Sequence, residues 1–487
     1  MGTSAHTARL NKDADQITFT TERQTYWDDY ATHFSHWARF RRYYRKRLED
    51  IYSLLVPPGL HVLELGCANG DLLARLKPSY GVGVDLSSRM VELARVSHPG
   101  LNFKIGDAHD FESNNKYDYI IMSDLVNDLW DVQRVFDSTL RHSHTGTRVI
   151  INFYSRLWEW PRKMAEVAGI AKSQLPQNWL TVDDISNLLT LAGFEVIHKT
   201  VEILWPFRAF GISYFCNRYL VKLWPFRILG LTTFVVARPR PYSASRSALP
   251  RVSVIVPARN EAGNIKSLFE RIPEMGAGTE LIFVEGHSQD NTYERIACEI
   301  AARPGRNAQL FRQVGKGKGD AVRLGFAKAT GDLFMILDAD LTVSPEELPR
   351  FYEAWRRGIG EFINGVRLVY PMEERAMRFF NMVANKMFGY VFSWLLGQSV
   401  KDTLCGTKVL SRKDYAIIEA NRRYFGDIDP FGDFDLLFGA ARYSLKIIDV
   451  PIRYRERKYG ETNIRRWKHG WLLLRMVLLA SRRLRFV

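Results

Sequence analysis

The apolar segment Leu333–Leu337 ends directly in two acidic residues, Asp338 and Asp340, which are separated by one alanine. An uninterrupted short apolar run bounded by polar residues is typical of a strand buried on both faces of a sheet. It favours an open α/β sheet, in which ligands bind beyond the carboxyl ends of the strands. If the chain turns after Leu337, both carboxylates can reach one divalent cation; the alternative is an ordinary Asp-rich turn.

The length of 487 residues predicts two or three domains. Four cysteines are scattered without a C-x-x-C pair, which argues against a disulfide framework or a zinc site and fits a reducing compartment. The first twenty residues are polar and contain no apolar segment typical of a signal peptide. Residues 1–25 are therefore expected to form a flexible tail.

The net charge of +15 and the pI of about 9.5 indicate an anionic partner, such as nucleic acid, a phospholipid surface or a phosphorylated substrate. The basic residues often lie among Trp, Phe and Leu, which suits a membrane interface better than a nucleic-acid groove. No run of eighteen uncharged apolar residues occurs, so a transmembrane helix is not expected. These features predict a protein that binds no nucleic acid and associates peripherally with the cytoplasmic face of a membrane.

The first half of the chain repeats a strand-then-helix pattern. HVLELGCANGDLLARL reads as a strand, a glycine-bearing turn and a helix, and a second strand, GVGVDLS, contains Asp85 at its end. A third unit places Asp107 at a strand end, and KYDYIIMSDLV supplies a fourth strand. Repeated units of this kind predict a parallel, doubly wound sheet, with Asp85 placed to accept hydrogen bonds from ribose hydroxyls.

These motifs resemble the class I S-adenosylmethionine-dependent methyltransferases over roughly residues 50–238. The resemblance implies that S-adenosylmethionine is bound by the glycine-rich first motif, a ribose-binding acid and an adenine-contacting pair. Those residues are Glu64, Gly66, Ala68 and Gly70, then Asp85, then Asp107 and Ala108. Ala68 stands where a glycine is common, and a degenerate domain kept as a scaffold is the alternative. No acceptor-side base is evident, although Asn127 and Asp128 follow the fourth strand, where related enzymes vary with substrate.

An insertion at about residues 203–230 contains the sequence WPFR twice, at Trp205–Arg208 and Trp224–Arg227. Each copy joins Trp and Phe to an Arg, as an interfacial membrane anchor requires. The alternatives are coincidence and a buried domain or dimer contact. Residues 239–250 are rich in Pro, Ser and Arg and are expected to form a linker, which gives domains at 26–238 and 251–487.

The second half begins a new α/β pattern with RVSVIVPARNEAGNI, followed by ELIFVEGHSQDNT, the glycine-rich GKGKGDAVRLGF and the strand that ends at Asp338. The glycine-rich segment lacks the spacing G-x-x-x-x-G-K-[ST], which excludes a P-loop. This order of motifs resembles the family 2 glycosyltransferases of the GT-A fold, most closely the polyprenyl-phosphate hexose synthases, from about residue 251 to at least 460.

The resemblance to this family implies a nucleotide-sugar donor, a polyprenyl-phosphate acceptor and Mg²⁺ or Mn²⁺. The metal would be held by Asp338 and Asp340. The other residues implied at the nucleotide sugar are Pro257, Asn260, Glu261, Glu285, Ser288, Lys318, Gly319 and Asp320. The segment that begins with Glu285 reads Glu-Gly-His-Ser, where Asp-Asp-Gly-Ser is usual in this family. This difference leaves the identity of the nucleotide base or of the sugar open.

The same resemblance implies an acceptor side in the last third of the chain. Lys408 and Arg412 are candidate cations there, and Arg466 is a candidate at a phosphate, with a solvated charge run as the alternative. Asp433 and Asp435 are candidates for a general base or substrate-orienting acid, with a helix N-cap as the alternative.

The C-terminal segment WKHGWLLLRMVLLASRRLRFV has Lys468, Arg475 and Arg482 at intervals of seven residues, which places them in one stripe of a helix. This pattern predicts an amphipathic helix that lies in the membrane interface, and residues 375–398 are a second candidate. Ordinary core packing is the alternative for both.

Together these observations predict a bifunctional enzyme. One domain would transfer a hexose from a nucleotide sugar to a polyprenyl phosphate with inversion, and the other would methylate a substrate of the same pathway. The alternative is transfer to a glycan hydroxyl, with the methyltransferase half as a non-catalytic scaffold. The sequence does not identify the hexose, the nucleotide, the methyl acceptor or the oligomeric state.

Overall fold

The structure, a computed structural model, describes residues 2–32, 34–167, 175–241, 249–367, 369, 379–424, 432–457, 459 and 466–486. Side chains in these ranges are described except at residues 2–14, 34–41, 165, 379–384, 423, 433 and 466–470. The chain divides into two compact units, Met1–Arg240 and Pro241–Val487. The division falls inside the stretch predicted as a linker, of which residues 242–248 lie outside the described residues.

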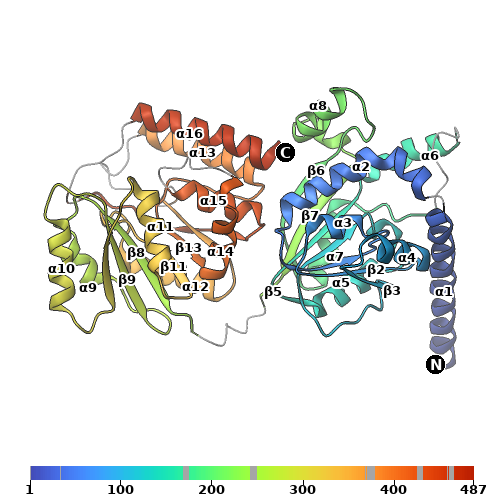
Figure 1. Ribbon diagram of the computed structural model, residues 1–487, viewed down its shortest axis with the longest axis horizontal. Coiled ribbons are helices and arrows are strands. Elements are labelled where there is room, and N and C mark those ends of the chain that lie inside the picture. The colour runs from blue at the N-terminus through green and yellow to red at the C-terminus, as the bar shows by residue number, and fades with distance from the viewer. Residues whose placement is uncertain are drawn as a thin grey trace. The chain divides into compact units, whose positions relative to one another are not determined.

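The first unit contains a seven-stranded sheet in the order β3-β2-β1-β4-β5-β7-β6 (Figure 1). Its strands are β1 (His61–Leu65), β2 (Tyr80–Asp85), β3 (Asn102–Ile105), β4 (Tyr117–Ser123), β5 (Ser143–Tyr154), β6 (Phe194–Glu202) and β7 (Thr232–Pro239). Strands β1 to β5 are parallel, and β7 is antiparallel to both β5 and β6. Strand β1 lies between β2 and β4, so the strand order reverses at β1. A ligand-binding crevice is expected at the carboxyl ends of these three strands.

Helices cover both faces of this sheet. They are α1 (Gly2–Thr32), α2 (Phe34–Leu55), α3 (Asp71–Leu76), α4 (Ser88–Ser97), α5 (Val132–Arg141), α6 (Glu159–Val167), α7 (Val182–Leu191) and α8 (Ile212–Arg218). Apolar residues of α2, α3 and α4 share one core with the sheet, and those of α5 and α7 share a second core on the other face. Alternate residues of each strand supply the two cores, as the near-continuous apolar runs predict.

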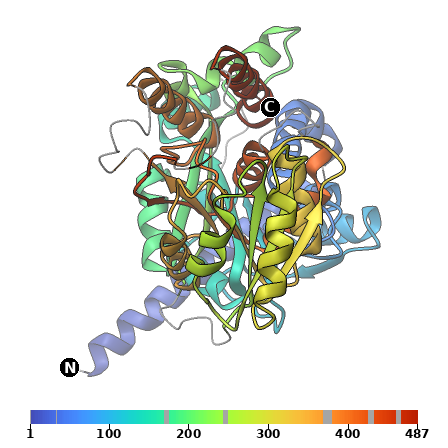
Figure 2. The same ribbon diagram turned by 90° about the vertical axis from the view of Figure 1, so that its left-hand side faces the viewer.

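Residues 1–25 were expected to form a flexible tail, whereas the structure describes Gly2–Thr32 as the single helix α1 (Figures 1 and 2). The end of this helix packs on the first unit, and the side chain of Arg23 is only 4% exposed. The helix has little apolar character, so composition alone gave no sign that it docks.

The second unit contains another seven-stranded sheet, in the order β10-β9-β8-β11-β13-β12-β14. Its strands are β8 (Val252–Ala258), β9 (Thr279–Glu285), β10 (Ala308–Arg312), β11 (Leu333–Ile336), β12 (Phe362–Val366), β13 (Lys408–Ser411) and β14 (Ile447–Pro451). Only β13 runs against its neighbours β11 and β12 among these strands. All four residues of β11 are buried, as the apolar run before Asp338 predicted.

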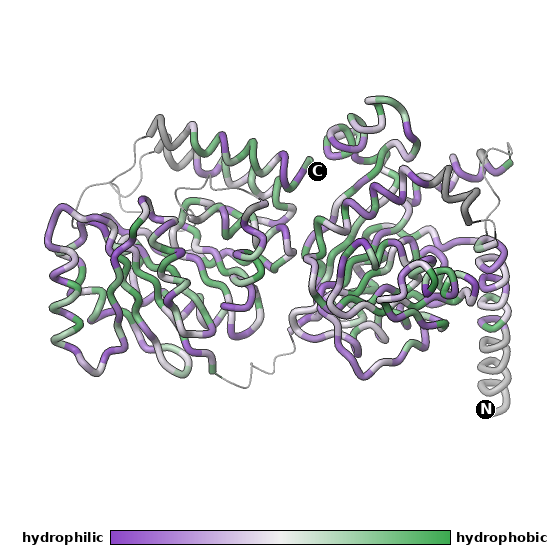
Figure 3. The backbone as a smooth tube through the Cα atoms, viewed as in Figure 1, coloured by the Kyte–Doolittle hydropathy of each residue, from purple (hydrophilic) through white to green (hydrophobic). Residues whose placement is uncertain are grey.

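Helices also cover both faces of the second sheet. They are α9 (Ile265–Arg271), α10 (Thr292–Ala302), α11 (Lys318–Lys328), α12 (Leu348–Arg356), α13 (Phe379–Leu396), α14 (Arg412–Ala420), α15 (Asp433–Arg442) and α16 (Arg466–Ala480). One core joins the sheet to α11 and α13–α16, and the other joins it to α9, α10 and α12. The hydropathy of the backbone follows this arrangement, with hydrophobic residues concentrated along the strands of each sheet (Figure 3).

Helices α13 and α16 lie side by side (Figures 1 and 2). Leu473 and Met476 of α16 are buried in the core, whereas Trp471, Leu474 and Leu478 are exposed. Core packing therefore accounts for one face of α16 and leaves a second apolar face open. Among the described residues, no helix has the length and hydropathy needed to span a bilayer.

Candidate active sites

A pocket in the first unit lies at the carboxyl ends of β1, β2 and β4. Six of the seven residues predicted to contact a cofactor line it: Glu64, Gly66, Ala68, Asp85, Asp107 and Ala108. Gly70 does not line it; this residue is the N-cap of α3 and has a left-handed φ of 76°. A Cβ on Gly70 would lie 2.5 Å from the ring of Phe103, so the turn requires glycine there.

Asp85 fixes the glycine-rich turn. Its Oδ2 accepts a hydrogen bond from the backbone N–H of Ala68 at 2.8 Å, and its Oδ1 accepts one from Ser87 at 2.9 Å. Burial raises the pKa of Asp85 although both hydrogen bonds act to lower it. Each oxygen keeps a second lone pair with which it can accept a hydroxyl hydrogen bond.

Glu64 has an unsatisfied oxygen in the same pocket. Its side chain is buried, and Oε2 has no hydrogen-bond partner in the structure. Burial, followed by the charge of Asp85, raises the pKa of Glu64 well above its ordinary value. An unpartnered buried carboxyl is costly unless a ligand satisfies it, so these residues fit a cofactor that carries hydroxyl or amino donors.

Asp107 and His109 form a hydrogen-bonded pair beside Ala108. The backbone N–H of Asp131 donates to Nε2 of His109, so Nδ1 carries the ring proton and donates to Oδ1 of Asp107. Burial alone would raise the pKa of Asp107, but the hydrogen bonds from His109 outweigh burial and the pKa lies below its ordinary value. Asp107 is thus ionised and held in one orientation.

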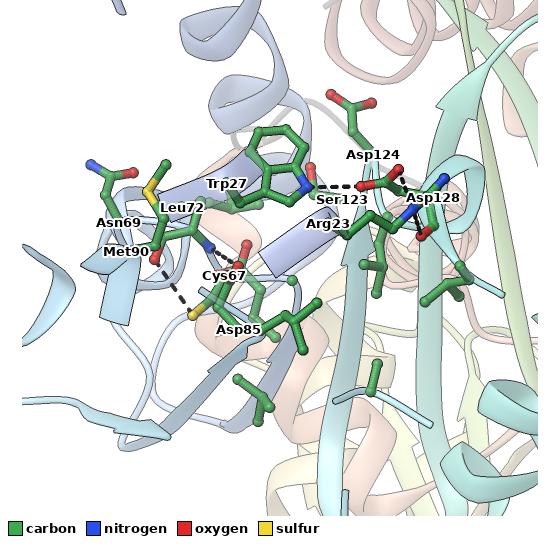
Figure 4. A pocket seen from close by; sticks show the side chains of 18 of the residues that line it. Arg23, Trp27, Cys67, Asn69, Leu72, Asp85, Met90, Ser123, Asp124 and Asp128 are labelled. Atoms are coloured by element: carbon green, nitrogen blue, oxygen red, sulfur yellow. Dashed lines mark hydrogen bonds and ion pairs between the residues drawn. The ribbon is translucent and has the colours of Figure 1, made fainter. Parts of the chain in front are cut away.

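Helix α1 closes one side of the pocket (Figure 4). Arg23 donates to Oδ1 of Asp128 at 3.0 Å, and the indole N–H of Trp27 donates to Oδ2 of Asp128 at 2.8 Å. Asp128 was predicted only as a residue that varies with substrate, and the structure gives it a definite structural partner. Arg23 and Trp27 lay outside the predicted site because nothing in the local sequence connects them to Asp128.

Replacing Arg23 by Ala should destabilise the first unit by about 3 kcal/mol, because it leaves the buried carboxylate of Asp128 without its ion-pair partner. Arg134→Ala is the matched control, since Arg134 pairs with Asp110 at the surface and such pairs contribute about 1 kcal/mol or less. The shift in the thermal unfolding midpoint of the first unit measures the effect. Equal shifts for the two variants would contradict the docking of α1 through Asp128.

Asp124 follows β4 at the edge of the pocket and was not predicted. It has a left-handed φ of 54° and accepts hydrogen bonds from the hydroxyls of Tyr44 at 2.9 Å and Tyr154 at 3.3 Å. The amide of Asn152 donates to it at 2.6 Å. A non-glycine residue in this conformation is uncommon, and such strain is concentrated at functional sites. Asp124 is therefore a candidate functional residue at the edge of the pocket.

The second unit brings the predicted donor-binding residues together at the carboxyl ends of β8, β9 and β11. Oγ of Ser288 accepts a hydrogen bond from the backbone N–H of Asn260 at 3.1 Å. Glu285 accepts one from the backbone N–H of Ser288 and also pairs with Arg312, at 3.1 Å. Pro257 lies within β8, two residues before the loop that contains Asn260 and Glu261. These contacts join the first two loops into one surface beside the Asp338 strand.

Both acidic residues after β11 have basic partners. Nζ of Lys318, the first residue of α11, lies 2.6 Å from Oδ1 of Asp338. Arg457 lies 2.6 Å from Oδ2 of Asp340 and 3.2 Å from Oε1 of Glu261. The sequence indicated a run of cations around Arg457 but not which one reaches the acids.

A hard cation fits this donor set. Asp338 and Asp340 offer carboxylate oxygens, and both side chains are partly exposed. No cluster of three His, Cys, Asp or Glu side chains suited to a metal occurs among the described residues. Mg²⁺ and Mn²⁺ need only one or two protein carboxylates where substrate phosphates supply the remaining oxygens.

The start of α15 contacts the start of α11. A Cβ on Gly319 would lie 2.9 Å from the backbone nitrogen of Gly432, which directly precedes α15. This places the backbone of Asp433 beside the glycine-rich loop, although its side chain lies outside the described residues. Asp435 is described and pairs with Arg422 at 3.1 Å. Asp320 of α11 accepts from the backbone N–H of Gly315 at 3.1 Å.

Two of the predicted acceptor-side cations differ from expectation. Lys408 is fully buried, and its ammonium donates to Oδ1 of Asn364 at 2.7 Å and to the carbonyl of Cys405. Arg412 donates to the carbonyls of Gly331 and Ala329, which precede β11, so it lies at the opposite end of the sheet from Asp338. Neither offers a cation to a ligand beside Asp338 in this structure. The side chain of Arg466 lies outside the described residues.

Glu261 should make the stability of the second unit depend on pH. Burial raises its pKa from 4.5 to about 7, although Arg457 acts to lower it, and this shift corresponds to about 3 kcal/mol. A carboxyl whose pKa is raised on folding contributes stability that is complete below 4.5 and is lost as pH rises through about 7. Relative to Glu261→Gln, the wild type should lose stability from about pH 5 to pH 8 in denaturant titrations. The free energy of unfolding of the wild type minus that of Glu261→Gln should therefore fall with pH. A value that stays constant or rises with pH would contradict the raised pKa of Glu261.

Two family models match the chain. One described as Glycosyl transferase family 2 matches residues 253–416, and one described as Methyltransferase domain matches residues 37–199. The chain joins a methyltransferase domain to a family 2 glycosyltransferase domain. Both families are families of enzymes. The two sheets are accordingly a Rossmann-like sheet in the methyltransferase domain and a GT-A sheet in the glycosyltransferase domain, as predicted.

The glycosyltransferase domain is similar to two curated transferases. A dolichol-phosphate mannosyltransferase of Pyrococcus furiosus is 30% identical over 224 residues, which cover 44% of this chain and 59% of the relative. An undecaprenyl-phosphate 4-deoxy-4-formamido-L-arabinose transferase of Edwardsiella ictaluri is 28% identical over 217 residues, which cover 43% of this chain and 62% of the relative. The chain thus spans about three fifths of the length of these relatives.

The methyltransferase domain is similar to solved structures. An S-adenosylmethionine-dependent methyltransferase from Mesorhizobium loti aligns with 39% of this chain and 95% of its own, at 20% identity and a TM-score of 0.31. Magnesium protoporphyrin IX methyltransferase from Synechocystis aligns with 45% of this chain and 99% of its own, at 16% identity and a TM-score of 0.33.

Proposed function

We propose that the glycosyltransferase domain transfers a hexose from a nucleotide sugar to a polyprenyl phosphate, with Mg²⁺ or Mn²⁺ and with inversion at the anomeric carbon. The observation that carries the proposal is the convergence of Asp338, Asp340, Lys318 and Arg457 at one sheet edge. The names of the two relatives, a dolichol-phosphate and an undecaprenyl-phosphate transferase, support the choice of acceptor.

The chemistry requires stabilisation of two developing charges. Cleavage of the sugar–diphosphate bond places negative charge on the leaving nucleoside diphosphate and positive character on the sugar ring. A cation held by Asp338 and Asp340 would offset charge on the diphosphate. Lys318 and Arg457 add positive charge at the same edge, while Asn260, Glu261, Glu285 and Ser288 form the surface proposed to hold the nucleoside.

A phosphate acceptor needs little help from a general base, because the second pKa of a phosphate monoester is about 6. It needs positive charge and an apolar surface for its chain. The exposed apolar side chains of α13 and α16, such as Tyr390, Trp394, Trp471 and Leu474, support a lipid acceptor. We further propose that the enzyme acts at the cytoplasmic face of the membrane, where nucleotide sugars are available.

The acceptor class can be tested with Asp433→Asn and Asp435→Asn. A glycan hydroxyl requires a base, so loss of the base should abolish transfer, whereas a phosphate acceptor should retain activity within about tenfold. The backbone of Asp433 lies beside the glycine-rich loop, so Asp433→Asn is the more informative of the two variants. Release of nucleoside diphosphate, measured with and without polyprenyl phosphate, reports the result. If the wild type releases nucleoside diphosphate with polyprenyl phosphate and a variant does not, transfer to the phosphate needs that carboxylate, which would contradict an acceptor that requires no base.

For the methyltransferase domain, we propose that Glu64, Asp85 and Asp107 hold S-adenosylmethionine and that Asp124 orients the methyl acceptor or takes its proton. The cofactor supplies an electrophilic methyl group when bound. The hydroxyls of Tyr44 and Tyr154 keep Asp124 in place and stabilise its charge. The methyl acceptor is proposed to be a substrate of the same pathway, and the fusion of the two domains in one chain supports this.

A further inference from the structure

The insertion at residues 203–231 of the methyltransferase domain exposes an unusual amount of apolar surface. Helix α8 lies beyond β6, outside the layers of helices that cover the sheet (Figure 1). Eleven large apolar side chains of the insertion are exposed, and Trp224 is 82% exposed. They are Trp205, Phe207, Phe210, Ile212, Tyr214, Phe215, Leu223, Trp224, Phe226, Ile228 and Leu229. So many exposed large apolar side chains within one short segment indicate an interaction site rather than ordinary solvent-exposed surface.

The base of the insertion is fastened by buried polar contacts, so the exposed side chains are held in place. Oδ1 of Asn217 accepts hydrogen bonds from the backbone N–H groups of Leu204 and Trp205, both at 2.7 Å. Its amide donates to the carbonyl of Trp205 and to the hydroxyl of Tyr43 on α2. The buried ion pair of Lys222 with Glu202 joins the second half of the insertion to β6. Polar contacts thus face the domain and apolar side chains face away from it.

The charge of the insertion is entirely positive. Residues 203–231 contain no Asp or Glu, and the two WPFR sequences each present an exposed arginine, Arg208 and Arg227, beside exposed Trp and Phe. Aromatic rings and arginines in this combination suit the headgroup region of a bilayer that carries anionic lipids. In a two-fold contact with a second copy, the patch would face its own like charges, which disfavours a dimer.

We propose that residues 205–229 form a membrane-docking surface that inserts its aromatic side chains into the interface of an anionic phospholipid bilayer. This surface rests on the proposed membrane location of the enzyme and assigns a segment that contacts the lipid. It does not depend on glycosyl transfer or on methyl transfer. It also places the methyltransferase domain, not only the glycosyltransferase domain, at the lipid surface.

Hydrogen–deuterium exchange on the full chain tests this surface directly. With vesicles of phosphatidylcholine and phosphatidylglycerol, backbone amides in residues 205–229 should exchange at least about tenfold more slowly than in buffer. Vesicles of phosphatidylcholine alone should protect them much less. Unchanged exchange in this segment would overturn the proposal even if the chain still bound vesicles, because α13 and α16 could then account for binding.

Variants separate docking from folding and from self-association. Phe210→Ser with Trp224→Ser, and Arg208→Glu with Arg227→Glu, should each remove the protection without changing the thermal unfolding midpoint. Val96→Ser with Leu191→Ser removes comparable exposed apolar side chains elsewhere in the same domain and should leave protection intact. If the insertion variants instead convert a dimer to a monomer in sedimentation velocity and retain vesicle protection, the surface is a protein interface and the proposal is wrong.

Discussion

Asp340→Asn is expected to lower hexosyl transfer by about a thousandfold, because it removes one of two carboxylates at the proposed metal site and the charge that holds Arg457. Asparagine has nearly the same size and can still accept the hydrogen bonds that Thr342 donates to Oδ1 of Asp340. The fold should therefore be preserved. Initial rates of nucleotide-sugar consumption, together with the unfolding midpoint of the variant, measure the effect.

Asp332→Asn is a matched control for this substitution. Asp332 precedes the same strand, β11, and lies at the opposite end of the sheet, where it accepts a hydrogen bond from the backbone of Arg251. Its replacement should leave the transfer rate within about twofold of wild type. If Asp340→Asn kept a tenth or more of the wild-type rate, Asp340 would not be part of the reacting centre.

Asp85→Ala is expected to weaken S-adenosylmethionine binding by about a hundredfold or more. The variant loses the acceptor for ribose hydroxyls, and hydrogen bonds to a charged group contribute about 1.5 to 3 kcal/mol each. It also frees the backbone N–H groups of Ala68 and Ser87, so the glycine-rich turn loses its anchor. Isothermal titration calorimetry with S-adenosylmethionine gives the affinities directly.

The control for Asp85→Ala is Asp110→Ala. Asp110 is an exposed acid near the same strand ends, and it pairs with Arg134 at the surface. Its affinity should match that of the wild type. Binding that is undetectable in the wild type, or equal in wild type and Asp85→Ala, would support the scaffold alternative for the methyltransferase domain.

The parts of the structure that could be predicted are those that local sequence determines. The run Leu333–Leu337 is apolar throughout because both faces of β11 are covered, and such a run is visible without tertiary information. The acids at strand ends, such as Asp85 and Asp107, converge because parallel strands share one carboxyl edge. The proposed roles of these residues rest on the resemblance to two known families.

The parts that could not be predicted depend on pairs that are distant in sequence. Helix α1 is polar in composition, and it docks through contacts of Arg23 and Trp27 with Asp128, which lies about a hundred residues away. Asp124 stands out only through its backbone conformation and through donors from α2 and β5. No local pattern signals either arrangement.

Lys408 shows why a basic residue at the expected sequence position is not sufficient evidence that it binds a ligand. It begins β13, opposite Asn364 on β12, and its side chain turns into the sheet toward that residue. Arg457 is the opposite case. It lies in a run of arginines and lysines whose sequence suggests only a solvated loop. The tertiary fold selects Arg457 to contact Asp340 and Glu261.

Transfer of a labelled sugar to the lipid tests the proposed acceptor most directly. The purified 487-residue chain is incubated with Mn²⁺ and radiolabelled nucleotide sugars, with and without a short polyprenyl phosphate. The products are then partitioned between organic and aqueous phases. The label of one hexose should enter the organic phase only when metal and polyprenyl phosphate are present, and it should stay aqueous with Asp340→Asn. Donor consumed only in the presence of soluble glycans, with no label in the organic phase, would contradict the lipid-phosphate acceptor.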